Sequence, residues 1–352
     1  MKLNNKYIIG TNVMFYEIEI LHENIDAYIQ CCEGIENPEN ITFDFLFNLS
    51  QYLEGIDTSK ISVDELKDRF LEQMKRLEDI GVKVIKRFYE DDSKLYCIAD
   101  YRRDLNYNNC MDNDYIIWGE TDSLFPKQFF EALERIKMYA SQQNIHRYIT
   151  WFASRKMWDD SWKPLEHIAF ENEKYISIKD FETEEQYKEA ISKSPHSIRY
   201  VMGIDEMNEI NSKYDDIDIL QMSYPKFNGC GLVISSDLIK NGVNIPPGIF
   251  GVVAEDTAMM LNCHHMMQGA YRQFVVKNVL LVHNREHPNK RMYALDNKTG
   301  KESVSIGEGG YGHGKGNWYD TISEINKTNT HLLGPRQDKF KTIDDFLNES
   351  KN

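Results

Sequence analysis

Apolar strands that alternate with amphipathic helices limit the fold of this chain more than any other feature of its sequence. Residues 7–9 form a short apolar run typical of a strand, whereas residues 23–33 carry apolar side chains three to four positions apart, as a helix does. The capping sequence that opens at Ser62 predicts a helix that ends before Gly81, and residues 82–88 are typical of the next strand. Strands separated by helices in this way predict an α/β domain with a largely parallel sheet.

The same alternation continues through the middle of the chain. Residues 115–118 form a strong apolar strand, and Pro126 suits the first position of an amphipathic helix that reaches about Tyr139. Further strands are predicted over residues 147–152, 227–235 and 273–282, and further helices over residues 255–268 and 318–325.

The net negative charge of the chain argues against one class of partner, duplex DNA. The 352 residues include 41 Lys and Arg against 56 Asp and Glu, which gives a formal net charge of −15. Nonspecific binding of duplex DNA depends on clustered basic residues, so strong duplex DNA binding is not expected. A local basic pocket for a phosphorylated small molecule stays compatible with this charge.

Cysteine spacing and hydropathy indicate a cytoplasmic protein. The six cysteines show no CxxC spacing, which argues against a zinc knuckle and for reduced thiols. The apolar run near residue 8 is too short for a signal peptide, and no window of about 18 apolar residues follows. We therefore expect no membrane span.

Two carboxylates follow the strand at residues 115–118, namely Glu120 and Asp122. Because they stand two positions apart where a strand becomes a loop, both can point to one place above the carboxyl edge of the sheet. Hard oxygen ligands of this kind suit Mg²⁺ or Mn²⁺. The alternative is a helix start that uses Thr121, Asp122 or Ser123 as its cap and binds no metal.

Four segments, in order along the chain, together resemble the GT-A glycosyltransferases of the family 2 type. They are residues 7–13, residues 98–104, the acidic segment 114–126, and the pair formed by 227–235 and 255–261. The resemblance implies a GT-A, Rossmann-like fold with a mixed, mostly parallel sheet flanked by helices. It also implies transfer of a sugar from a nucleotide-diphosphate donor, a UDP-sugar by default, to an acceptor hydroxyl with inversion.

The resemblance further implies where the donor and a metal ion bind. Mn²⁺ or Mg²⁺ is expected at Glu120, Asp122 and His283, where His283 follows the last core strand. The alternative for His283 is a strand-end histidine hydrogen-bonded to the backbone. The residues expected to bind the nucleotide sugar are Thr11, Asn12, Asp100, Arg102, Arg103, Glu120 and Thr121.

Catalysis and acceptor binding are assigned by the same resemblance. Asp256 is the expected base that takes the proton of the acceptor hydroxyl, and its neighbour Glu255 orients the base or the acceptor. Both open a helix, whose dipole keeps carboxylates ionised, and a solvated helix start without function is the alternative. The acceptor, which is a glycan, lipid, protein or modified base, is expected at Trp158, Asp159, Trp162, Gly229 and Gly231.

The expected organisation is one glycosyltransferase domain over residues 1–285 and a C-terminal extension over 286–352. The nucleotide-binding half ends at about residue 125, and the acceptor half follows it. In the extension, the Gly-rich stretch 307–316 lacks the pattern of a P-loop, so it is either a plain loop or a lid whose His313 or Lys315 reaches the diphosphate.

Two other functions on the same fold stay open at this point. A sugar nucleotidyltransferase needs a basic, Gly-rich phosphate loop after its first strand, and residues 10–19 contain no Lys or Arg. A carbohydrate- or partner-binding protein that has lost the chemistry is the other, and the retained acidic residues argue against it.

Overall fold

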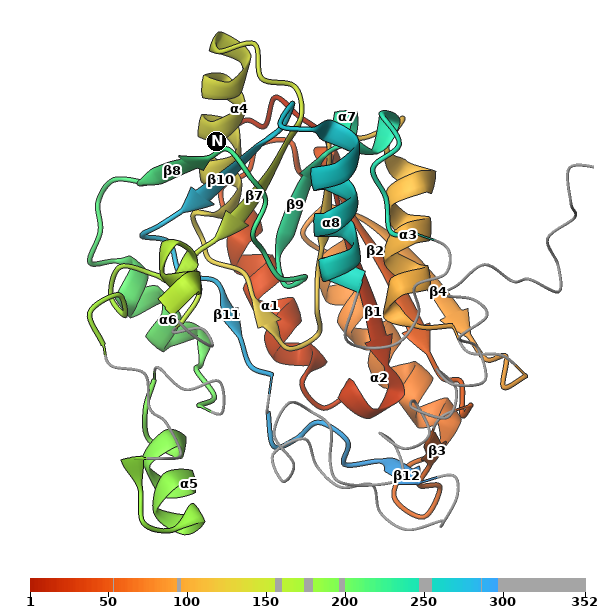
Figure 1. The fold of residues 1–352 in the computed structure, drawn as a ribbon. Helices are drawn as coiled ribbons and strands as arrows, with labels where there is room; N and C mark the ends of the chain where they lie inside the picture. Colours follow the sequence, from red (N-terminus) through yellow and green to blue (C-terminus); the bar gives the residue numbers. More distant parts are fainter. Residues whose placement is uncertain are drawn as a thin grey trace, which may run out of the picture.

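The computed structural model describes residues 1–52, 54–93, 96–155, 160–173, 180–195, 200–246, 255–285 and 287–296. An eight-stranded sheet forms the centre of this part of the chain (Figure 1). In spatial order its strands are β4 (Lys83–Tyr89), β2 (Ile41–Asn48), β1 (Tyr7–Met14), β5 (Tyr115–Trp118), β9 (Leu232–Ser235), β7 (Tyr148–Phe152), β10 (Arg272–Val276) and β8 (Ile219–Met222).

Most neighbouring strands of this sheet are parallel. β4, β2, β1 and β5 form one parallel group, and β7 and β10 form another. β9 lies between the two groups and is antiparallel to both, while β8 closes the edge antiparallel to β10. The predicted fold class, a mixed and mostly parallel sheet flanked by helices, is therefore confirmed.

Helices cover both faces of the sheet. Successive side chains of each strand point to opposite faces, so each face has a hydrophobic core of its own beneath its helices. Ile9 belongs to the core under α1 (Leu21–Cys32), α2 (Val63–Glu78) and α4 (Phe129–Gln142). Its neighbour Ile8 belongs to the opposite core, under α3 (Ile98–Asn109), α7 (Ser236–Lys240) and α8 (Glu255–Met267). The other helices are α5 (Glu184–Ser192) and α6 (Ile204–Asn211), with short 3-10 helices η1 (Phe15–Glu17), η2 (Pro38–Asn40) and η3 (Asp160–Leu165).

The local sequence explains the helix α2. Ser62 Oγ accepts a hydrogen bond from the Glu65 amide at 3.1 Å, which is the predicted N-terminal cap. Four apolar side chains three to four positions apart, Leu66, Phe70, Met74 and Leu77, are then buried on one face.

Three predicted strands differ in extent from the structure, and two strands of the central sheet, β2 and β8, were not predicted. β1 continues to Met14 instead of ending at residue 9. β9 begins at Leu232 instead of residue 227, because Gly231 has a φ of +66° and ends the extended backbone before it. The last predicted strand is two: β10 ends at Val276, and the chain turns before it resumes as β11 (Val282–His283). Of the two strands that were not predicted, β2 is buried between β4 and β1, and its apolar residues Ile41, Phe43, Phe45 and Phe47 stand at every second position.

A second, small sheet brings residues 282–283 beside the acidic segment 114–126. β11 pairs antiparallel with β6 (Ser123–Leu124), so that His283 lies opposite Ser123. A third sheet joins β12 (Ala294–Asp296) to β3 (Glu54–Ile56), and Tyr293 packs into the core under α1. Residues 287–296, which were assigned to the extension, thus lie against the first half of the chain.

None of the helices in the described ranges is long and apolar enough to cross a membrane.

Candidate functional site

The acidic loop, residues 119–123, leaves β5 at the carboxyl edge of the parallel strands. Asn24 Nδ2 donates to the carbonyl oxygens of Glu120 at 3.1 Å and Ser123 at 2.8 Å. Ser123 Oγ donates to the Glu120 carbonyl at 2.6 Å. The loop leads into β6, and the next helix has Gln128 as its N-cap, so the interpretation of this loop as a helix cap is wrong.

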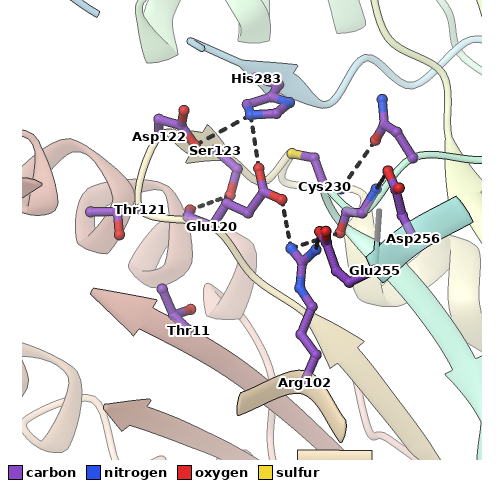
Figure 2. A network of polar contacts seen from close by, with 12 residues as sticks. Thr11, Arg102, Glu120, Thr121, Asp122, Ser123, Cys230, Glu255, Asp256 and His283 are labelled. Atoms are coloured by element: carbon purple, nitrogen blue, oxygen red, sulfur yellow. Dashed lines mark hydrogen bonds and ion pairs between the residues drawn. The ribbon is translucent and has the colours of Figure 1, made fainter. Parts of the chain in front are cut away.

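His283 meets both carboxylates of the acidic loop. Its Nε2 lies 2.8 Å from Glu120 Oε2 and 3.4 Å from Asp122 Oδ1 (Figure 2). Its Nδ1 accepts a hydrogen bond from Arg285 Nε at 3.2 Å, so the ring interacts with side chains and not, as the alternative had it, with the backbone. The three residues predicted to hold a metal therefore lie together.

The side chains of Glu120, Asp122 and His283 are of the types that bind divalent cations, and metal binding by them stays a prediction. Two carboxylates and an imidazole suit Mn²⁺, and Mg²⁺ takes the same carboxylates. Burial alone would raise the pKa of Glu120, but attraction to His283 and Arg102 outweighs it and lowers that pKa to about 2. Burial is likewise outweighed at Asp122, where Lys290 and His283 hold the pKa well below its usual range. Both carboxylates are ionised, as ligands must be.

Arg102, on α3, connects the acidic loop to the start of α8. Its Nη2 donates to Glu120 Oε1 at 2.5 Å, and its Nη1 donates to Glu255 Oε1 at 2.6 Å. Nη2 also lies 3.3 Å from the Gly229 carbonyl, and the guanidinium stacks over Trp118 with 4.7 Å to the ring centroid. Only 1% of the side chain is exposed, so Arg102 is a buried residue that links Glu120 to Glu255.

The two carboxylates at the start of α8 have different surroundings. Glu255 is buried against Arg102, and burial raises its pKa to about 7 although Arg102 opposes the shift. Asp256 is partly exposed; its Oδ2 accepts from the Gly229 amide at 3.2 Å and its Oδ1 from the Thr257 amide at 2.6 Å. Of the pair, Asp256 is the one that an incoming molecule can reach.

Two glycines before β9 are required by packing at the site. A methyl group on Gly229 would lie 2.2 Å from Arg102 Nη1. One on Gly231 would lie 2.4 Å from Leu281 Cδ1, and the positive φ of Gly231 also disfavours a side chain. Acceptor binding by these glycines stays a prediction.

Thr11 and Asn12 lie in the second half of β1, close to the acidic loop. Thr11 is fully buried, and its Oγ1 lies 3.2 Å from the Tyr28 hydroxyl. Asn12 Nδ2 lies 3.8 Å from Met14 Sδ, and its buried Oδ1 has no hydrogen-bond partner among the described residues. Thr121, on the loop itself, donates from Oγ1 to Glu17 Oε2 at 3.0 Å.

Asp100 and Arg103 are not brought to the acidic loop. Asp100 Oδ2 accepts from the Cys97 amide at 3.1 Å and so caps α3. Arg103 donates to Asp100 and to the carbonyl oxygens of Ile245 at 3.0 Å and Pro246 at 3.1 Å. These contacts stabilise the start of α3 and the loop beside it, and nucleotide-sugar binding by Asp100 and Arg103 stays a prediction.

The aromatic segment is described only in part. Trp162 lies in η3, partly buried against the core under α8, with Lys226 Nζ 4.9 Å from its ring centroid. Trp158, Asp159, His313 and Lys315 lie outside the described residues, as does the helix predicted over 318–325.

Three residues at the site were not singled out from the sequence. Lys290 Nζ lies 2.8 Å from Asp122 Oδ2 and 3.1 Å from Glu17 Oε1. Cys230 brings a sulfur close to Glu120 and His283. Its position between two glycines was a usable signal, whereas nothing in the local sequence marks Lys290 or Glu17.

Comparison with known proteins finds distant structural likenesses. No protein-family model matches the chain, and no curated protein matches it. The S. aureus TarS 1-349 structure in complex with UDP-GlcNAc is 10% identical with a TM-score of 0.37, over 93% of this chain and 66% of that one. A second TarS 1-349 structure matches over 79% of this chain and 60% of its own. This chain therefore covers less than two thirds of that structure.

Two further structures show likenesses of the same order. A mycobacterial protein is 9% identical with a TM-score of 0.38, over 81% of this chain and 69% of that one. UDP-glucose pyrophosphorylase complexed with UDP-glucose is 8% identical with a TM-score of 0.34, over 77% of this chain and 90% of that one. Likenesses as distant as these show no function for this chain.

Proposed function

We propose that this chain is a metal-dependent, inverting GT-A glycosyltransferase that moves a sugar from a nucleotide-diphosphate donor to an acceptor hydroxyl. The observation that carries the proposal is the meeting of Glu120, Asp122 and His283 at the carboxyl edge of the sheet. Ligands of open α/β sheets bind at this edge. The resemblance to family 2 makes a UDP-sugar the default donor.

The donor diphosphate is proposed to lie over the acidic loop, with the nucleoside toward the end of β1. Mn²⁺ or Mg²⁺, held by Glu120, Asp122 and His283, would neutralise the charge of the diphosphate. The unpartnered Oδ1 of Asn12 supports a polar ligand near this strand end, since buried amide oxygens are rarely left without a partner.

Asp256 is proposed as the general base. It takes the proton of the acceptor hydroxyl while that oxygen forms a bond to the anomeric carbon. The bond between the anomeric carbon and the diphosphate oxygen breaks, and the nucleoside diphosphate leaves with the electron pair. The partial exposure of Asp256 and its two backbone hydrogen bonds support this role, because they leave the carboxylate reachable and fix its orientation.

Glu255 is proposed as a positioning residue. Arg102 binds Glu255 and Glu120 at once, and thereby sets the distance between the donor loop and the helix that carries Asp256. An inverting transfer needs this spacing, since the acceptor must attack opposite the leaving diphosphate.

Calorimetric titration with UDP and a panel of UDP-sugars, with Mn²⁺ and with EDTA, tests the donor site. Mn²⁺ should tighten binding, and Asp122→Ala should abolish the Mn²⁺ effect. Asp112→Ala, which alters an exposed carboxylate away from the loop, is the matched control and should bind as the wild type does. Equal affinity in Mn²⁺ and EDTA would contradict a metal-dependent site.

A further inference from the structure

Cys230 has no part in the proposed transfer reaction, yet its thiol lies within the acidic site. The ligand atoms of Glu120, Cys230 and His283 all lie within 4.8 Å of one another. The three residues come from separate segments: the loop after β5, the turn before β9, and β11 (Figure 2). They are close enough for one small ion to reach all three after small side-chain adjustments.

The backbone around Cys230 is held on every side. Its amide donates to Asn228 Oδ1 at 3.0 Å, and its carbonyl accepts from Trp151 Nε1 at 3.0 Å. The next residue, Gly231, donates to the Trp118 carbonyl at 2.9 Å. With 2% of the residue exposed, Cys230 presents its sulfur to the site from a fixed position.

The donor set selects the class of ion. A thiolate, an imidazole and a carboxylate suit Zn²⁺, which commonly takes three protein ligands and leaves one position open. Mg²⁺ and Ca²⁺ prefer oxygen ligands, and a sulfur adds nothing to their binding. Asp122, the second carboxylate, is bound to Lys290 at 2.8 Å. Glu120 contacts Arg102 through Oε1, whereas its Oε2 is the oxygen that faces His283.

We propose that Glu120, Cys230 and His283 bind a thiophilic divalent cation, Zn²⁺ by the chemistry of its donors. On binding, the Cys230 thiol gives up its proton to the solvent. The single proton of the His283 ring moves from Nε2 to Nδ1, so that Nε2 binds the ion and Arg285 no longer donates to Nδ1. The site stands on its own geometry and does not depend on the transfer reaction.

Zn²⁺ at this site excludes Mn²⁺ from the proposed donor site, because both ions need Glu120 and His283. Zn²⁺ therefore blocks the Mn²⁺-dependent binding of the donor. This consequence rests on the proposed function, whereas the Zn²⁺ site itself does not.

Titration of the full-length protein with Co²⁺, a spectroscopic substitute for Zn²⁺, tests the site without any nucleotide. The wild type should show a sulfur-to-cobalt charge-transfer band. Added Zn²⁺ should displace Co²⁺ and abolish this band. Cys230→Ser should lose the band and bind Zn²⁺ more than about tenfold more weakly, since even outer-shell partners change metal affinity by about 10–100-fold. Cys263→Ser, at another buried free cysteine, is the matched control and should keep the band.

A wild type without the band, or a band that survives in Cys230→Ser, would overturn the proposal. Should Cys230→Ser fail to fold, zinc-edge X-ray absorption of the wild type decides instead: one sulfur at about 2.3 Å is expected, and a shell of nitrogen and oxygen alone contradicts it. A cobalt band without nucleotide-sugar binding would keep the Zn²⁺ site and refute the transferase. Nucleotide-sugar binding without a cobalt band would refute only the Zn²⁺ site.

Discussion

Lys290 Nζ lies 2.8 Å from Asp122 Oδ2, although 168 residues separate the two along the chain. The same ammonium lies 3.1 Å from Glu17 Oε1, and all three side chains are largely shielded from water. Burial alone would lower the pKa of Lys290, but Asp122 and Glu17 outweigh it and raise that pKa. A buried cation of the protein thus ties the acidic loop to the turn after β1.

Lys290→Met should lower the free energy of unfolding by about 3 kcal/mol, because it leaves two buried carboxylates without their cation. Urea unfolding measures the change. Lys75 pairs with Asp79 at 3.0 Å on the exposed face of α2, so Lys75→Met is the matched control and should leave stability unchanged. Equal, small effects of both substitutions would show that the Lys290 contact has no structural role.

Arg102 and Glu255 should be energetically coupled. A double-mutant cycle with Arg102→Met and Glu255→Gln should give a coupling energy of about 1–3 kcal/mol in unfolding experiments, since the pair is buried. Arg135 and Glu131 lie at the same kind of distance, 2.5 Å, on the surface of α4. That pair should give less than about 0.5 kcal/mol. A cycle that finds no difference between the two pairs would contradict the role given to Arg102.

Asp256→Asn should lower kcat by about 10²–10⁴-fold while donor affinity stays within twofold or so, as expected for the loss of a general base. Glu255→Gln should change both, because it weakens the Arg102 contact that also holds Glu120. Rate assays combined with calorimetry separate the two. Loss of donor binding in Asp256→Asn would show that the base is assigned wrongly.

The parts of the site that lie at strand ends were predictable from the sequence. Glu120 and Asp122 follow an apolar strand, and parallel strands bring their carboxyl ends to one edge, so a ligand site at that edge follows from the pattern alone. His283 was placed correctly even though its strand was predicted as one element instead of two. The family resemblance, and not the residue pattern alone, indicated this histidine, and the pairing of β11 with β6 brings it beside the acidic loop.

The contacts that balance the charges were not predictable. Lys290 reaches Asp122 across a long stretch of sequence, and no local pattern marks a lysine that becomes buried. Arg102 and Arg103 were both expected to bind the nucleotide sugar, and the contacts of Arg102 with Glu120, Glu255 and the Gly229 carbonyl were not foreseen. Which charge pairs with which depends on the packing of α3 against the sheet, and residue type alone does not encode it.

His167 should make stability depend on pH. It is fully buried, and burial lowers its pKa to about 4. The unfolded chain binds the proton near pH 6.5, so the contribution of neutral His167 is complete above about pH 6.5 and is lost as the pH falls toward 4. Between pH 8 and pH 5 the wild type should lose about 2 kcal/mol on this account.

His167→Asn, which keeps an acceptor near the Ala169 amide, should lose correspondingly less stability over that range when unfolding is measured at both pH values. The exposed His146 provides the matched control, and His146→Gln should follow the wild type. A slope in His167→Asn equal to that of the wild type would refute the assignment.

The most direct test of the proposed transferase is the release of nucleoside diphosphate from a panel of nucleotide sugars in the presence of Mn²⁺. The wild type should release UDP from at least one UDP-sugar, and Asp122→Ala, folded as judged by its thermal unfolding, should not. Release by Asp122→Ala at the wild-type rate in saturating Mn²⁺, or no release from any donor by the wild type, would contradict the account.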